Sequence, residues 1–245
     1  MKFTSLTTIA LAASHTALAS IISSWEFTGN PSGGLRDVTF PLKIDGTVHK
    51  SDYFFSQQLR FQGVAGLTIC GIGNQPNGPG GESIVRAQFI SDYQLGTTTQ
   101  DSNCRLVSGV PSDDTITCTV DFSGSYGALY NIVVEQVKGT TWKATVVDTS
   151  NGKSVHIGSW TLPSTAGGIR PNELGYVRYY GPMGPGMCSP PLPRAEVIIY
   201  DPFSRTLGAG TGHINEPFNF FYPCEGGIGY SAENIGNGYH IRFGL

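Results

Sequence analysis

The sequence predicts an all-β protein built as a sandwich or a barrel. Short runs rich in β-branched and aromatic residues recur along the chain, and Gly, Pro, Asn and Asp separate them. No stretch keeps a 3.6-residue hydrophobic period, and the nearest candidate for a helix, residues 87–95, is too short. Many short strands joined by turns are typical of a sandwich or a barrel.

The first nineteen residues have the features of a secretory signal peptide. Lys2 precedes an apolar, small-residue stretch that runs to Leu18. Ala17-Leu18-Ala19 has the small-x-small form of a signal peptidase site, so we expect cleavage after Ala19. The stretch is too short and too rich in Ser and Thr for a membrane span. The sequence therefore predicts a secreted, extracellular protein.

Composition narrows the possible partners. Charged residues make up 13% of the 245 residues, the net charge is −3, and 33 residues are Gly. A chain with this little charge and this many aromatic residues is expected to fold, not to stay disordered. The slight negative charge gives no basic surface for nucleic acid or for anionic membranes.

The predicted strands begin with an aromatic run and continue as a meander. An Asn151-Gly152 turn between two β-type runs is a strong hairpin signature. We expect one domain over residues 20–245, with a Pro- and Gly-rich C-terminal extension over 181–245. The expected strands are 51–61, 116–122, 130–137, 142–149, 155–162, 196–200 and 239–243.

Five cysteines lie beyond the signal peptide, and an oxidising compartment favours disulfides. Proximity in the sequence pairs Cys104 with Cys118, and Cys188 with Cys224. Cys70 is left over in an apolar run and is expected to be a buried free thiol. No cysteine spacing matches a zinc site, so no metal and no cofactor is predicted.

Several runs resemble an uncharacterised secreted family of bacteria and fungi, domain of unknown function 3472. They are SDYFFSQQLRFQG, GLTICGIG and, most specifically, GTTWKATVVDTSNGKSVHIGSWTLPSTAGGI followed by GYVRYYGP. The resemblance covers residues 51–180 and implies a jelly-roll-like β-sandwich of the lectin and glucanase kind, without an established activity. The chain departs from the family at residues 67–71, where relatives carry an aromatic residue and a glutamine. No ligand role is therefore carried over to that segment.

Strand alternation suggests one open face that could bind a ligand. If Val155 and Ile157 face the core, His156 and Trp160 share the opposite face. Asn131 and Glu135 are expected on the same face, and Arg178 is a further candidate. An aromatic surface beside directional hydrogen-bonding groups suits a sugar.

A structural interpretation competes with each of these assignments. Trp160 and Trp142 are more often core residues than ligand platforms. His156 is commonly a satisfied structural histidine, and Glu135 commonly a solvated strand residue. Asp148 suits a turn.

Sequence patterns that indicate catalysis are weaker than those that indicate ligand binding. Glu135 and His156, with Arg178 as a charge-neutralising partner, are candidates for a polysaccharide lyase or hydrolase. The sequence has no carboxylate pair spaced i, i+2 on a strand and no G-x-S-x-G elbow. Asp113-Asp114 is weak evidence for calcium.

These observations favour a secreted protein that binds a polysaccharide or a cell-surface glycan, such as a fungal effector or a wall-associated protein. The first alternative is the lyase or hydrolase. The second is an effector that binds a host protein through the aromatic segment 218–222.

Overall fold

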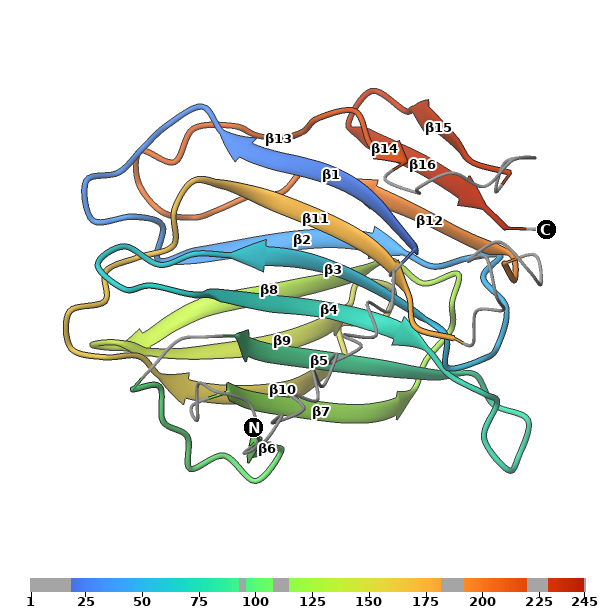
Figure 1. Ribbon diagram of the computed structural model, residues 1–245, viewed down its shortest axis with the longest axis horizontal. Coiled ribbons are helices and arrows are strands. Elements are labelled where there is room, and N and C mark those ends of the chain that lie inside the picture. Colours follow the sequence, from blue (N-terminus) through green and yellow to red (C-terminus); the bar gives the residue numbers. More distant parts are fainter. Residues whose placement is uncertain (1–18, 93–95, 108–114, 182–191, 220–228, 245) are drawn as a thin grey trace, which may run out of the picture.

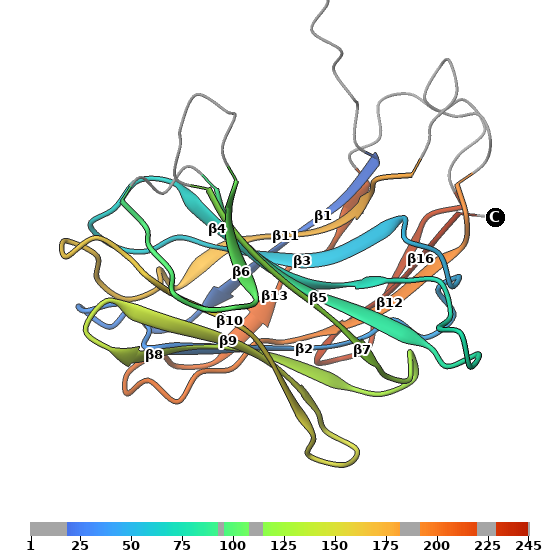
Figure 2. The ribbon, with the colours of Figure 1, turned by 90° about the horizontal axis from the view of Figure 1, so that it is seen from below.

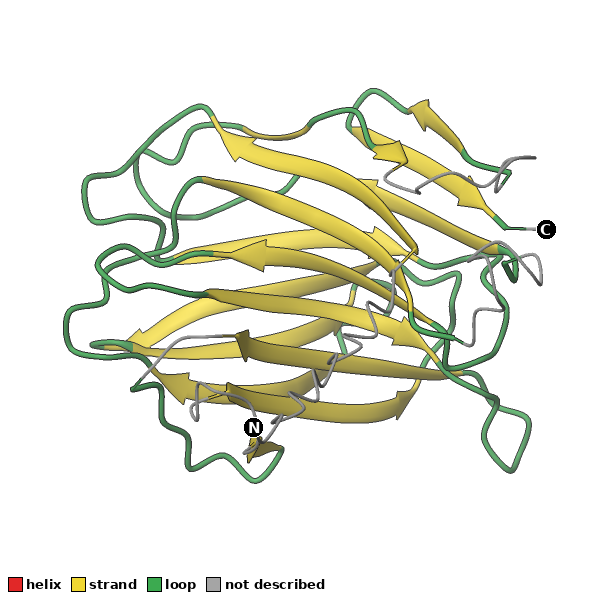
Figure 3. Ribbon diagram, in the orientation of Figure 1, coloured by secondary structure: helices red, strands yellow, loops and turns green. Residues whose placement is uncertain are grey.

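The computed structural model describes residues 19–92, 96–107, 115–181, 192–219 and 229–244. Within these ranges every regular element is a strand (Figure 3). None of the described residues forms a helix long and apolar enough to span a membrane. The all-β prediction is therefore confirmed for the described chain.

The strands form two antiparallel sheets, which lie one above the other in Figure 2. In spatial order, the larger sheet contains β13 (Gly212–Ile214), β1 (Ala19–Phe27), β11 (Asn172–Tyr179), β3 (Tyr53–Leu59), β4 (Leu67–Asn74), β5 (Ile84–Asp92), β7 (Thr115–Ser123) and β6 (Cys104–Val107), and β14 (Phe218–Asn219) also pairs with β1. The smaller sheet contains β10 (Ser154–Thr161), β9 (Thr141–Asp148), β8 (Tyr130–Lys138), β2 (Asp37–Lys43), β12 (Ala195–Tyr200), β16 (Gly238–Phe243) and β15 (Ser231–Asn234). Figure 1 shows how these strands cross the molecule.

The core between the sheets is rich in aromatic residues. Trp25, Trp142 and Trp160 are each at most 1% exposed. Trp142 and Trp160 are directly opposite each other on β9 and β10. Trp160 also stacks on Phe89 of the other sheet, with ring centroids 3.6 Å apart. Burial of such large apolar surfaces is the main stabilising contribution expected for a sandwich of this kind.

Most of the predicted strands occur close to their expected bounds, including the meander β8–β9–β10. Residues 84–92, which overlap the helix candidate, form β5 because they pair with strands on both sides. The described residues of the C-terminal extension contribute strands to both sheets. β12 pairs with β2, and β13 pairs with β1.

The cysteine predictions have three outcomes. Cys104 and Cys118 form the expected disulfide across the β6–β7 pair. Cys70 is free and fully buried, as expected. Cys188 and Cys224 lie outside the described residues, as do Asp113 and Asp114.

Candidate functional site

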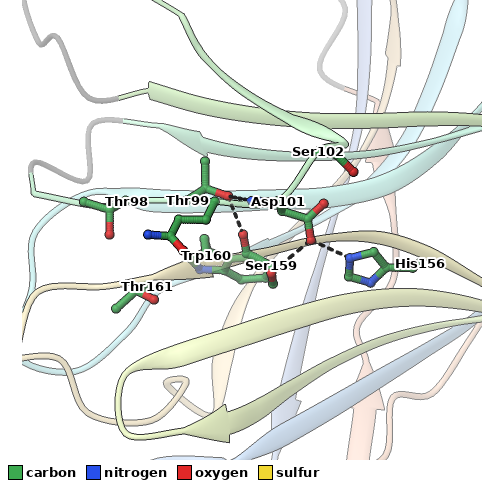
Figure 4. Close-up of a pocket in the computed structure, with 9 residues that line it drawn as sticks. Thr98, Thr99, Asp101, Ser102, His156, Ser159, Trp160 and Thr161 are labelled. Atoms are coloured by element: carbon green, nitrogen blue, oxygen red, sulfur yellow. Dashed lines mark hydrogen bonds and ion pairs between the residues drawn. The ribbon is translucent and has the colours of Figure 1, made fainter.

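A polar pocket of about 650 Å³ lies where the segment before β6 runs along the edge strand β10. Hydroxyl, amide, carboxylate and imidazole groups dominate its lining (Figure 4). The residues that line it are Thr98, Thr99, Gln100, Asp101, Ser102, His156, Ser159, Trp160 and Thr161. A volume of this size is typical of small-molecule sites.

The segment that contains Thr98 and Thr99 is hydrogen-bonded to β10. These bonds use groups that would otherwise be unpaired at the edge of the smaller sheet. Thr98 and Thr161 exchange two backbone hydrogen bonds of 2.9 and 2.8 Å. The Thr99 hydroxyl donates to the Ser159 carbonyl oxygen at 2.7 Å. These bonds extend the smaller sheet by one short segment. They therefore fix the position of this wall of the pocket relative to β10.

Asp101 connects the two halves of the pocket. Its Oδ2 lies 2.5 Å from His156 Nε2 and accepts a hydrogen bond from the Ser159 hydroxyl at 2.9 Å. Its Oδ1 accepts from the Asn103 backbone N–H at 3.0 Å. The Asp101 side chain is only 9% exposed, whereas the His156 side chain is 44% exposed. The carboxylate is therefore an internal anchor, and the imidazole faces the solvent.

The charge state of Asp101 follows from these contacts. Burial alone would raise its pKa, but the hydrogen bonds from His156, Asn103 and Ser159 outweigh burial and hold the pKa below its usual value. The group is thus an anion that accepts three hydrogen bonds. His156 contacts Asp101 through Nε2. The other ring nitrogen, Nδ1, is not part of this contact and is available for a ligand or water.

A β-bulge in β10 changes which side chains face this pocket. The register shifts between His156 and Gly158, so the regular alternation is lost at Ile157. His156 and Ser159 consequently point outward, and Ile157 and Trp160 point into the core. Our prediction that Trp160 shares the open face with His156 is therefore wrong. Trp160 is 1% exposed and offers no aromatic platform.

The remaining predicted residues do not gather at the pocket. Glu135 shares the outer face of the smaller sheet, but β9 separates it from β10, and it pairs with Lys143 and Arg205 at 2.9 Å each. These cations hold the Glu135 pKa below its usual value. A joint catalytic role of Glu135 and His156 is therefore not supported by the geometry.

Asn131 and Arg178 also lie apart from the pocket lining. Asn131 pairs with Pro41 and Val147 on the smaller sheet. Arg178 belongs to the larger sheet, where its guanidinium lies 4.2 Å from the Tyr176 ring centroid. The expected single ligand face is thus divided between two sheets.

Sequence reasoning missed Asp101, Ser159 and the hydroxyl-rich segment 97–102. The sequence did contain a pattern that indicates a polar loop here. Cys104 is directly preceded by Thr97-Thr98-Thr99 and Asp101-Ser102-Asn103. A disulfide-anchored polar loop is a common position for binding residues. Among the described residues, no cluster of three or more His, Cys, Asp or Glu side chains could hold a metal ion.

Comparisons with known proteins give a distant likeness only. No protein-family model and no curated protein matches the chain. Among solved structures, scytalido-glutamic peptidase with a transition state analog inhibitor has a TM-score of 0.37 at 13% identity, over 92% of each chain. SCP-B, a member of the eqolisin family of peptidases in complex with the tripeptide Ala-Ile-His, has a TM-score of 0.34 at 10% identity, also over 92% of each chain. With TM-scores this low, the likeness carries no functional conclusion.

Proposed function

We propose that this chain is a secreted protein that binds a neutral polysaccharide or cell-surface glycan in the pocket beside β10. The observation that carries the proposal is the lining: a pocket of about 650 Å³ whose exposed side chains are hydroxyl and amide groups together with the His156 imidazole. Sugars offer dense hydroxyl donors and acceptors, which such side chains recognise by direct hydrogen bonds. Thr98, Gln100 and Ser102 are exposed and supply both donors and acceptors.

Charge favours a neutral ligand over an acidic one. Asp101 is the single carboxylate among the residues that line the pocket, and no Lys or Arg lines it. A uronate or a sulfated sugar would bring a second negative charge near Asp101 without a cation to balance it. Neutral glucans, xylans or chitin fragments do not carry this penalty.

Glycan-array binding followed by titration calorimetry tests the proposal. The wild-type chain should bind at least one neutral oligosaccharide. Because Gln100→Ala removes an exposed amide from the lining, it should weaken that binding about tenfold, which corresponds to one or two lost hydrogen bonds. His213→Gln is a matched control, since His213 is an exposed residue of β13 that contacts Asp201 and does not line the pocket. Equal affinity of Gln100→Ala and wild type for every bound sugar would overturn the assignment.

A second candidate is an acid–base enzyme that acts on the bound sugar. The observation in its favour is the Asp101–His156 pair, in which a buried carboxylate orients a half-exposed imidazole. Such a pair can take a proton from a substrate or a water molecule. Release of shortened or unsaturated products by the wild type, lost in His156→Gln, would identify this activity. Binding without product release supports the first proposal.

A further inference from the structure

The Cys104–Cys118 disulfide lies directly behind the pocket and touches both of its halves. Cys104 follows Asp101 by three residues, and its N–H donates to the Asp101 carbonyl oxygen at 3.0 Å. On the other side, Gly158 sits in the bulge of β10. A Cβ atom at Gly158 would lie 2.5 Å from Cys104 Sγ and 2.6 Å from Cys118 Sγ. The two sulfur atoms therefore occupy the space that a side chain at position 158 would need.

The Cys104 end of the disulfide lies at the edge of the sandwich, where few hydrogen bonds among the described residues are added to the Thr98–Thr161 and Thr99–Ser159 bonds and the Asp101 contacts described above. β6 has four residues and is the last strand of the larger sheet. Beside its pairing with β7, this part of the chain is joined by the Asn103 side chain, which donates to the His156 carbonyl oxygen at 3.0 Å. Thr119 N–H donates to the Asn103 carbonyl oxygen, also at 3.0 Å. An edge strand of this length depends strongly on its covalent link.

We expect the hydrophobic core to depend less on the Cys104–Cys118 disulfide than β6 does. Cys118 is fully buried in β7, which pairs with β5 along eight residue pairs. The tryptophans and Phe89 pack inside the sandwich with many other apolar side chains, and Trp160 stacks on Phe89. Cys104 is only partly buried whereas Cys118 is fully buried, so we expect an external thiolate to attack the Cys104 sulfur.

We propose that this disulfide is a redox-sensitive clamp that holds Asp101 against His156 and thereby keeps the pocket in its binding form. The proposal rests on the ligand-binding role of the pocket argued above. A dithiol reductant transfers two electrons: its thiolate attacks Cys104 Sγ, the sulfur–sulfur bond breaks, and Cys118 leaves as a thiolate that takes up a proton. The second thiol of the reductant then releases Cys104 as a thiol, and the reductant ends as its own disulfide. The freed β6 edge no longer fixes Asp101, while the sandwich stays folded.

Two readouts on the full chain test the clamp. Long-range ¹H–¹⁵N spectra of the His156 ring report whether Nε2 is bonded to Asp101, and calorimetry with a neutral oligosaccharide reports binding. In Cys104→Ala/Cys118→Ala we expect the His156 ring signals to shift toward those of Asp101→Asn, with affinity lower by at least about tenfold. Near-ultraviolet circular dichroism from the buried tryptophans should be retained. Addition of dithiothreitol to the wild type should reproduce the change in the His156 ring signals, and it should not move those signals further in the double variant.

Unchanged His156 signals in the double variant would overturn the clamp, and so would unfolding of the sandwich, because the proposal requires the core to survive. If the oxidised wild type binds no sugar, the proposed function fails. The His156 spectra still decide whether the disulfide holds the pair. Reductant effects that persist in the double variant would point to cysteines other than Cys104 and Cys118, and would contradict the assignment.

Discussion

Asp101 Oδ2 and His156 Nε2 lie 2.5 Å apart although 55 residues separate them in the sequence. The loop that carries Asp101 leads into β6, the last strand of the larger sheet, and the strand that carries His156 is the edge of the smaller one. The pair therefore joins the two layers at their rim, beside the pocket. A contact of this kind fixes both the position of the imidazole and the width of the opening.

Replacement of Trp160 by Ala should destabilise the protein by about 3–5 kcal/mol, because the change leaves a large cavity in the core. Urea unfolding followed by tryptophan fluorescence measures this loss. Trp160→Phe should cost less, since it keeps an aromatic ring against Phe89 and removes an indole N–H that has no partner among the described residues. A Trp160→Ala variant as stable as the wild type would mean that the indole lies at the surface.

Gly158→Ala should destabilise the protein by about 1–3 kcal/mol and should weaken ligand binding, because the added methyl group would overlap both disulfide sulfurs. Gly33→Ala is the matched control. A Cβ at Gly33 meets nothing within 4 Å, and its φ is not in the left-handed region. Thermal unfolding and calorimetry on the two variants should separate them clearly. Equal stability of the two variants would contradict the packing of the disulfide on the bulge.

The folded state should lose stability in acid partly through Asp101. Its pKa is lowered in the folded protein, so its contribution is present above the usual aspartate pKa and is lost as pH falls through the lower folded value. Free energies of unfolding measured between about pH 6 and about pH 2 should decline less steeply in Asp101→Asn. Glu135 contributes in the same direction, but its partly exposed ion pairs are screened by salt. An unchanged acid slope in Asp101→Asn would show that the carboxylate is not held by its three donors.

The Cys70 thiol should be inert in the native protein. Burial raises its pKa to about 12, so almost none of it is thiolate at neutral pH. Mass spectrometry after iodoacetamide treatment should find Cys70 unmodified in buffer and fully alkylated in guanidinium chloride. Cys70→Ala identifies the peptide concerned. Rapid alkylation in buffer would show that the strand β4 opens readily or that the thiol is exposed.

Much of the architecture could be predicted from local pattern. The Asn151-Gly152 turn and the alternation in residues 130–161 place β8, β9 and β10 nearly as the structure has them. Proximity in the sequence was enough to pair Cys104 with Cys118. These features depend on short-range chemistry, which a single sequence contains.

The site depended on two features that a sequence does not display. One is the bulge after His156, which moved Trp160 from the open face into the core by shifting the alternation by one residue. The other is the approach of Asp101 from a distant loop, which no spacing rule encodes. Glu135 illustrates the same limit, since its ion pair with Arg205 spans 70 residues and occupies a side chain that the alternative, catalytic interpretation needs.

A neutral sugar should bind in the pocket beside β10. Chemical-shift mapping on the ¹⁵N-labelled chain, titrated with the neutral oligosaccharide chosen from the array, locates the binding site residue by residue. We predict that the backbone signals of Thr99, Asp101, Ser159 and Thr161 move together with saturation, while those around Arg178 on the larger sheet stay in place. Movement confined to the residues around Arg178, or no movement at any sugar concentration, would contradict the claim.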